Sequence, residues 1–232
     1  MGIPPSPVAA ASARRSGLQR TREGAVRARS RAICHLKALV VTAPEGLRSQ
    51  LRRLDDAELV PRCARLRTGA QQSTEHRMTV KALRATARRV LALEAEAADL
   101  ESELELLVSR ICPAVLAEPG VGVFSAAELL NAWSHAGRLR CEAAFAMLGG
   151  AAPIPASSGQ TVRHRLNRGG DRQLNRALHT IVISRLQHHP ETQAYAARRA
   201  AEGRTPKEVK RCLKRFVARR MFRLLEAEAR MA

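Results

Sequence analysis

The sequence predicts an all-α protein, and three observations lead to that fold class. Hydrophobic residues make up 45% of the 232 residues, which is enough for a folded core, whereas aromatic residues make up only 3%. The core must therefore be built from alanine, leucine and valine, and a chain rich in alanine and leucine favours helices. Apolar residues also recur every three or four positions, as in amphipathic helices. No stretch approaches the roughly 18 apolar residues of a membrane span, so we expect no membrane partner.

The first 70 residues predict a leader and three helices. Residues 1–17 lack the apolar core and cleavage site of a signal peptide, and we expect a disordered leader there. Residues 18–41 carry apolar positions at helical spacing with arginines between them, and Pro44 and Gly46 end that helix. Short helices are expected near 46–53 and 55–66.

Residues 79–111 show the most regular pattern in the chain, a heptad repeat. Two heptad positions hold apolar residues or threonine: Leu83, Val90, Ala97, Leu104 and Ile111 at one, and Thr86, Leu93, Leu100 and Leu107 at the other. Such a repeat predicts a coiled coil or a long helical hairpin, with a helix packed inside its own domain as the alternative. The second half of the repeat is acidic, so an antiparallel partner or the basic helix at 18–41 fits better than a parallel copy. We expect residues 18–112 to form one helical connector.

Pro113 starts the C-terminal domain, predicted to span residues 113–232. A short helix, a PGVG turn and a second helix resemble a helix-hairpin-helix, in which Gly120 and Gly122 would let backbone N–H groups approach a phosphate. A plain helical hairpin is the alternative. Ser125 and Glu128 have the spacing of a capping box at the start of the second helix. Another helix is expected at 139–148.

A loop of about twenty residues, with the sequence PIPASSGQTVRHRLNRGG at 153–170, follows these helices. Asp171 is expected to cap the next helix, which Pro190 ends before another helix near 191–202. Thr205 and Glu208 form a capping box with a proline at the first helical position, which predicts the start of the last helix.

The last helix is expected to separate apolar from basic residues. Its inward positions would be Val209, Leu213, Phe216, Val217 and Leu224, and its outward positions Lys210, Arg211, Lys214, Arg215, Arg219 and Arg220. A solvated face is the simplest interpretation of such a stripe, but so many like charges with almost no acid suit a phosphate surface better.

Charge along the whole chain points to nucleic acid. The formal net charge is +19, with 14 Lys/Arg against 5 Asp/Glu in residues 1–70, 6 against 7 in residues 71–112, and 20 against 9 in residues 113–232. Two basic blocks flanking a neutral one attract polyanions, although arginine-rich composition of the source proteome is an alternative cause.

Cysteine and histidine spacing predicts no metal site. The five cysteines contain no CxxC pair, and neither cysteine nor acid stands at ligand spacing from the adjacent His188 and His189. An odd number of separated cysteines fits thiols in a reducing compartment.

The loop at 153–170 can bind phosphate, and its residue types alone leave open whether a serine attacks. Ser157 and Ser158 precede Gly159, and Arg163, Arg165 and Arg168 could neutralise phosphate oxygens, with Arg172 close behind. Gly159, Gly169 and Gly170 permit close backbone approach. His164 could carry a proton, although a loop histidine is more often surface. A serine needs an activating base or metal, and the sequence has no GxSxG elbow typical of esterases.

Taken in order, PGVG, PIPASSG and RLNRGGDRQLNRALH resemble the C-terminal part of insertion-sequence transposases of the 110/1111 group, the RNA-guided bridge recombinases related to the Piv invertase. The resemblance is dense from Val115 to Leu225 and looser upstream to Ala13, where RAICHLKALVVTAPEGLR is similar to the start of the family's coiled-coil connector. Asp171 stands where the family often has asparagine.

The resemblance implies a function in DNA transposition and recombination. Ser158, with Ser157 as the alternative, would attack a DNA phosphodiester and form a phosphoserine link. Transposon-end and target duplex DNA would be partners, together with a structured guide RNA and a second copy through the coiled coil. The location would be the bacterial cytoplasm, at the nucleoid.

The family's other active-site part is an N-terminal RuvC-like domain whose acidic residues imply Mg²⁺. Nothing before Ala13 could hold such a domain, and residues 1–22 contain no Asp or Glu. The sequence therefore predicts a truncated copy or a misassigned start, with no metal ligands of its own. The alternative function is an inactive nucleic-acid-binding remnant; an unrelated helical RNA-binding protein would leave the ordered motifs unexplained.

Overall fold

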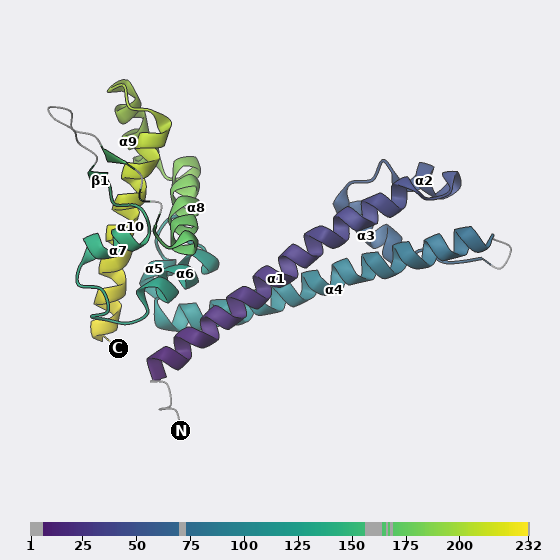
Figure 1. Cartoon of the computed structure of the whole chain (residues 1–232), viewed down its shortest axis with the longest axis horizontal. Coiled ribbons are helices and arrows are strands. Elements are labelled where there is room, and N and C mark those ends of the chain that lie inside the picture. The colour runs from purple at the N-terminus through teal and green to yellow at the C-terminus, as the bar shows by residue number, and fades with distance from the viewer. Residues whose placement is uncertain (1–6, 70–72, 156–163, 166, 168, 232) are drawn as a thin grey trace. The chain divides into compact units, whose positions relative to one another are not determined.

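The computed structural model describes residues 7–69, 73–155, 164, 165, 167 and 169–231, and within them the predicted all-α class is confirmed (Figure 1). These residues form ten helices and one ladder of two short strands. The chain divides into two compact units, residues 18–102 and residues 103–232 with 1–17, which are described separately below.

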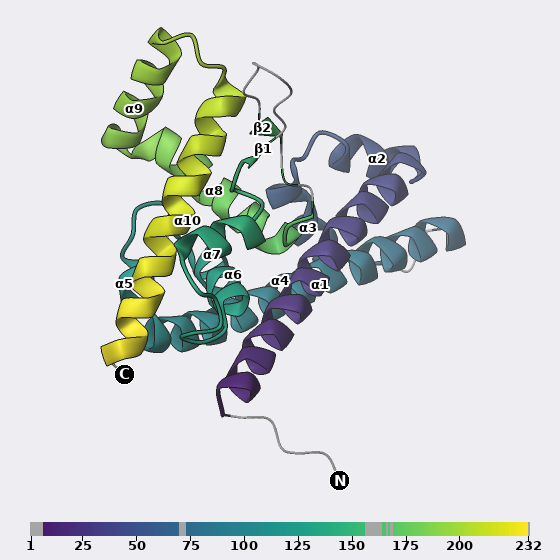
Figure 2. The same ribbon diagram turned by 60° about the vertical axis from the view of Figure 1, so that its left-hand side comes forward.

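The unit at residues 18–102 is built on two long helices that lie side by side (Figures 1 and 2). These are α1 (Pro7–Val41) and α4 (Thr74–Ile111), and the short helices α2 (Glu45–Leu51) and α3 (Asp56–Ala64) lie between them in sequence. Leu36, Leu83 and Val90 are fully buried in a shared core with residues of α3. The core thus joins segments that are about fifty residues apart in the chain.

The acidic half of α4 is paired with the basic helix, as the charge pattern favoured. Arg22 and Arg29 of α1 contact Glu101 and Glu94 of α4 at 3.3 and 3.0 Å. The expected start of the first helix, at residue 18, is too late, because α1 begins at Pro7. Residues 7–17 of the expected disordered leader are therefore helical. Their alanines have high helix propensity, and proline is well suited to a first helical position.

Of the two apolar heptad positions in α4, the one that contains Leu83 is well predicted to be buried. Leu83, Val90, Ala97 and Leu104 are all buried. Ile111, which was predicted to share this heptad position, is 39% exposed, so that prediction is wrong. The helix ends there, and Cys112 turns inward before Pro113 begins the next element.

The unit at residues 103–232 packs short helices around one long one (Figure 2). Its elements are the last turns of α4, then α5 (Pro113–Leu116), α6 (Val123–Trp133), α7 (Glu142–Leu148), β1 (Ile154–Pro155), β2 (His164–Arg165), α8 (Arg172–His188), α9 (Pro190–Ala201) and α10 (Pro206–Met231). Helix α10 contacts each of α5 to α9. Phe145, Leu178 and Met221, from α7, α8 and α10, are fully buried in its core.

Two of the three predicted helix caps are confirmed. The Asp171 carboxylate accepts hydrogen bonds from the N–H groups of Gln173 and Leu174 at 2.8 and 3.1 Å. Thr205 and Glu208 form the reciprocal bonds of a capping box, and α10 starts at Pro206 between them.

The predicted cap at Ser125 is wrong. Helix α6 begins at Val123 with extended Gly122 as its N-cap, and the Ala126 N–H already donates to the Gly122 carbonyl at 2.9 Å. Ser125 therefore lies inside the first turn and is buried. The helix therefore starts three residues earlier than predicted, with Gly122 at the N-cap position, where glycine is one of the favoured residues.

The apolar stripe of α10 differs from the prediction at Phe216, which is 54% exposed. The buried row is Leu213, Val217, Met221 and Leu225, at a spacing of four. Phe216 lies about 100° around the helix from Val217, outside that row. Leu224 is half-buried.

The basic stripe of α10 also needs correction. Lys214 is half-buried rather than outward. Arg219 and Arg220 are paired with Glu142 of α7 and Glu118 of the hairpin. These carboxylate partners lie 77 and 102 residues away in the sequence, so the residues next to α10 do not reveal them.

Candidate nucleic-acid interface

The loop that carries the two serines is closed at its base by a two-stranded ladder. Strands β1 and β2 pair antiparallel, with Ile154 opposite Arg165 and Pro155 opposite His164. Residues 156–163, which connect them, lie outside the described residues, as do Arg168 and the side chains at 164 and 165. The predicted site residues outside the described part are Ser157, Ser158, Gly159, Arg163 and Arg168.

The backbone at Gly170, after the ladder, passes very close to the backbone at Gly150, before it. A Cβ atom on Gly170 would lie 2.7 Å from the Gly150 nitrogen and 2.8 Å from the Leu148 carbonyl oxygen, so only glycine fits there. The next N–H, that of Asp171, donates to the same Leu148 carbonyl at 2.7 Å. Gly169, in contrast, has only ordinary contacts around it. The close crossing fixes where the C-terminal end of the loop meets helix α8.

Asparagines and one lysine complete the base of the loop. The Asn167 side chain donates to the Met147 carbonyl at 3.0 Å, and its oxygen accepts from the Gly169 N–H at 3.0 Å. Asn175 of α8 donates to the Gly149 carbonyl at 2.6 Å and accepts from Lys214 of α10 at 2.7 Å. A chain of hydrogen bonds therefore runs from α10 through α8 to the end of α7.

Neither asparagine was among the predicted site residues. The signal that could have found Asn175 is its position four residues after the cap Asp171, on the same side of α8. Asn167 lies two residues before the glycine pair, a spacing typical of a turn closed by its own side chain.

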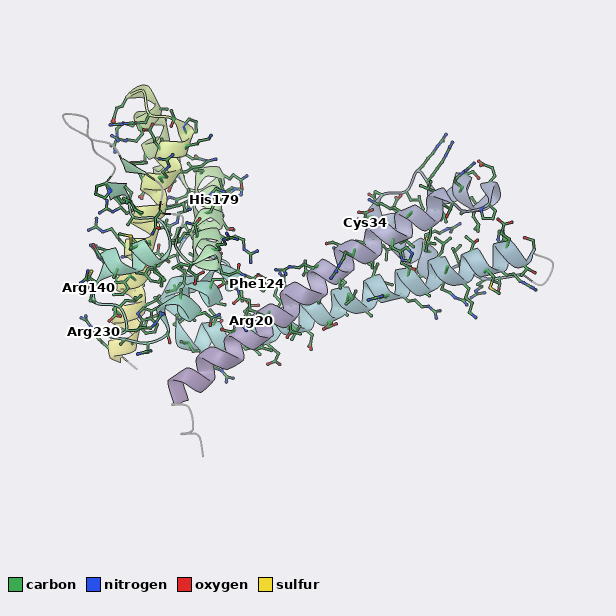
Figure 3. The ribbon with its side chains drawn as sticks, in the orientation of Figure 1. Arg20, Cys34, Phe124, Arg140, His179 and Arg230 are labelled. Carbon is green, nitrogen blue, oxygen red and sulfur yellow. The ribbon has the colours of Figure 1, made fainter. Side chains whose placement is uncertain are left out.

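Helices α8 and α10 form a basic surface next to this base, which we call the α8–α10 surface. The charges of Lys210 and Lys214 on α10 act on His179 of α8. To these residues we add Arg172 of α8 and Arg211 and Arg215 of α10, predicted phosphate contacts whose side chains are exposed. Figure 3 shows His179 projecting from α8. Of the predicted phosphate contacts, Lys210 and Lys214 are the ones that the structure links to α8, through His179 and Asn175.

The positive charge of the surface contributes to the lowered pKa of His179. Burial lowers the pKa of His179, and the nearby charges of Lys214 and Lys210 lower that pKa further. Burial likewise lowers the pKa of Lys214. Glu208, at the start of α10, is engaged by Thr205, whose N–H and hydroxyl lower the pKa of that carboxyl. A bound phosphate would relieve the repulsion among the cations.

The PGVG turn is tied to the core, and its two glycines differ. Gly120 has φ +75°, and a Cβ atom there would lie 3.1 Å from the Ile181 carbonyl oxygen of α8. Glu118, beside it, contacts Arg185 at 2.9 Å and Arg220 at 2.8 Å. Gly120 thus packs against protein, whereas Gly122 has open space around it at the start of α6. Only Gly122 offers an unobstructed backbone to a phosphate.

Comparison with known proteins assigns this part of the chain. Residues 112–197 match the model of the Transposase IS116/IS110/IS902 family. We call this matched range the transposase domain, after the family whose model it matches. The chain is also similar to the insertion element IS110 uncharacterized 43.6 kDa protein of Streptomyces coelicolor, at 32% identity over 109 residues. That match covers 46% of this chain and 27% of the relative, so the chain spans about a quarter of the relative's length.

The transposase domain contains Gly150 and Gly170, the base of the serine loop, and the α8 residues of the α8–α10 surface. Its matched range begins at Cys112, where α4 has ended, and stops within α9. Lys210, Arg211, Lys214 and Arg215 lie beyond the match, on α10. Hydrogen bonding between Lys214 and Asn175 nevertheless makes α10 part of the same structural unit.

No acidic metal centre accompanies the transposase domain in the described part of the chain. Among those residues, no three His, Cys, Asp or Glu side chains are grouped as a metal ion would require. Magnesium ligands of the kind that the resemblance implies are thus not supplied by the described residues. None of the described helices is long and apolar enough to cross a bilayer.

Proposed function

We propose that this transposase domain binds duplex DNA on the α8–α10 surface and uses Ser158 as the nucleophile that cleaves and rejoins a DNA strand. The observation that carries the proposal is the fixed base of the serine loop. The ladder, the Gly170–Gly150 crossing and the Asn175–Lys214 hydrogen bond hold both ends of the loop beside a basic surface. A nucleophile needs such a support, because in-line attack tolerates little misplacement.

The proposed reaction conserves the phosphodiester energy. The Ser158 Oγ would lose its proton and form a bond to phosphorus while the bond from phosphorus to the leaving sugar oxygen breaks, and the leaving oxygen would take up a proton. Attack on the phosphoserine by another strand's hydroxyl would reverse these steps and rejoin DNA. Arg163, Arg165 and Arg168 would neutralise the non-bridging oxygens, since catalysis of phosphoryl transfer depends mainly on position and charge.

The arginines of the loop neutralise charge, but they do not activate the Ser158 hydroxyl for attack. A serine hydroxyl is a weak nucleophile near neutral pH. The family resemblance implies that Mg²⁺ on acidic residues of a RuvC-like domain supplies this chemistry. The described residues do not fit that ion. We therefore assign positioning and charge neutralisation to this chain and no metal-dependent step.

DNA binding is tested by salt dependence and by neutralising the surface. We expect the logarithm of duplex affinity to fall linearly with the logarithm of salt concentration. Arg172→Gln with Lys210→Gln should weaken binding and reduce that slope by about 2, one unit per lost phosphate contact. Fluorescence anisotropy with labelled duplex DNA measures both quantities.

A matched pair controls for net charge. Arg110→Gln with Arg140→Gln removes the same charge from exposed positions outside the α8–α10 surface (Figure 3 labels Arg140). Its salt slope should remain that of the unmodified protein. Equal losses in both pairs, or an affinity independent of salt, would contradict a phosphate-binding role for this surface.

Guide RNA and self-association are further proposals that rest on the family resemblance. In α4, Leu83 and Val90 already pack against α1 of the same chain, so a second copy would use another face of the helices. Mass photometry of the protein with and without a structured RNA tests both proposals. A monomer that never shifts in mass would contradict them.

A further inference from the structure

Phe216 is an aromatic side chain displayed on the surface of a chain that has few. Phe145, Phe222 and Trp133 are buried in the core of the same unit. Phe216 is 54% exposed, and it is the aromatic member of the large hydrophobic residues that are exposed in the described part of the chain. A half-exposed phenyl ring is an apolar surface that a ligand could cover, if its neighbours suit that ligand.

Phe216 belongs to an ordered cluster between α9 and α10. Its ring lies edge-on to that of Tyr195, with centroids 5.9 Å apart and planes at 85°. The Arg198 guanidinium lies over the Tyr195 ring, 5.5 Å from its centroid. The T-shaped contact leaves the faces of the two rings in different directions and holds them in place. We call Tyr195, Arg198 and Phe216 the aromatic cluster.

The charge around the cluster is strongly positive. Residues 190–216 contain eight Lys/Arg and three Glu. Two of the three glutamates are engaged: Glu202 pairs with Arg199, and Glu208 caps α10 and contacts Arg204. Arg198, which lies over the Tyr195 ring, has no ion-pair partner among the described residues. A ligand here should therefore combine flat apolar rings with negative charge.

Unpaired nucleotides have that combination. Exposed aromatic rings stack on bases, and arginines around them follow the phosphate backbone, which is how proteins bind single strands without reading sequence. In a duplex the base faces are covered by their neighbours. A protein partner with an apolar, acidic face would need the same complementarity but would not distinguish single strands from duplexes.

We propose that the aromatic cluster binds a single-stranded nucleic acid by stacking of an unpaired base on Phe216. Because every base has a π face, the site accepts DNA and RNA strands with similar affinity. The inference concerns a ligand different from the duplex assigned to the α8–α10 surface, and it does not depend on attack by Ser158.

The test compares single strands with duplex on the full chain. Labelled oligonucleotides of about 12 nucleotides, within the site sizes of such surfaces, serve as probes: one DNA strand, one RNA strand and one DNA duplex. Phe216→Ala should weaken both single strands about tenfold and leave duplex affinity unchanged. Phe216→Trp should bind both single strands as tightly as the unmodified protein does. The fluorescence of the new indole should be quenched by either strand.

Leu106→Ala is the matched control, because Leu106 is 56% exposed and lies between Glu105 and Leu107 on an acidic part of α4. It should bind all three probes like the unmodified protein. Circular dichroism checks that Phe216→Ala keeps its helical content. Unchanged single-strand affinity in Phe216→Ala, equal loss for strand and duplex, or an unquenched indole would each overturn the proposal.

Discussion

Gly170 shows how one residue can determine where the serine loop is anchored. The distances of 2.7 to 2.9 Å that a Cβ atom would have to Gly150 and Leu148 involve backbone, which cannot move aside as a flexible side chain can. The adjacent Gly169 has no such restriction. The two glycines of the RGGD sequence are therefore not equivalent, although the sequence presents them as a pair.

We expect Gly170→Ala to destabilise the protein by about 1–3 kcal/mol, the usual cost of forcing atoms into packed space. Gly169→Ala is the control and should change stability by less than about 0.5 kcal/mol, since its new methyl group meets only ordinary contacts. Urea denaturation followed by circular dichroism measures both. The same urea midpoint for the two variants would contradict the close contact between the Gly170 and Gly150 backbones.

His179 reports on the charge of the α8–α10 surface. Its pKa in the folded protein lies below the usual 6.5, because burial and the charges of Lys214 and Lys210 disfavour the imidazolium. The unfolded chain then binds more protons in this window, so stability falls as pH drops through 6.5 towards the folded pKa.

Binding of DNA phosphates should raise the pKa of His179, because they offset the two lysine charges. A titration of the imidazole resonances by NMR, with and without duplex DNA, measures the change, and His179→Gln assigns the signal. If saturating DNA leaves the pKa where it was, phosphates do not lie at Lys210 and Lys214.

At the scale of elements, long-range pairs hold the short helices around α10. The pairs of Glu118 with Arg185 and Arg220 tie the PGVG turn to α8 and α10, and Glu142 ties α7 to α10 through Arg219 and Arg223. The Glu118 and Arg185 side chains are only 13% and 14% exposed. Removing one partner of such a partly buried ion pair lowers the free energy of unfolding more than removing one partner of an exposed pair.

We predict that Glu118→Gln destabilises the protein by about 2 kcal/mol, because it leaves two arginines without their carboxylate. Glu202→Gln removes an exposed pair with Arg199, three residues away on α9, and should cost less than about 0.5 kcal/mol. Thermal unfolding of the two variants compares them directly. A larger loss for Glu202→Gln would show that the turn is not held by Glu118.

The sequence predicts these elements better than their tertiary contacts. Capping residues such as Asp171 and Thr205 act within one turn, so local spacing locates α8 and α10 correctly. Ser125 has the spacing of a cap but lies inside α6, because Gly122 starts the helix earlier. Local pattern also misses the exposure of Phe216 and the partners of Arg219 and Arg220, which depend on residues distant in the chain.

At the scale of the whole molecule, the charge pattern predicted a polyanion partner, and residues 112–197 match the model of a transposase family. The candidate site could be predicted only in part. Residue types pointed to the loop at 153–170 and to α10, but the hydrogen bonds of Asn167 and Asn175 appear only once the chain is folded.

On unmodified duplex DNA, we expect the chain by itself to bind but not to transfer strands, since a serine hydroxyl is a weak nucleophile that needs activation. Gel analysis for nicked or joined products, with Mg²⁺ present, tests this expectation. Joined products that disappear in Ser158→Ala would contradict it and show that the chain is catalytically sufficient. Binding without chemistry on any substrate would instead favour the alternative, an inactive nucleic-acid-binding remnant.

The central claim is that Ser158 attacks phosphorus, and an activated phosphodiester tests it most directly. Thymidine p-nitrophenyl phosphate has a leaving group that needs no proton, and at about pH 9 hydroxide can accept the serine proton, so neither metal nor general acid is required. Mass spectrometry should find a thymidylyl phosphoserine at Ser158 in the unmodified protein and in Ser157→Ala, and none in Ser158→Ala. An adduct at Ser157, or no adduct at all, would contradict the claim.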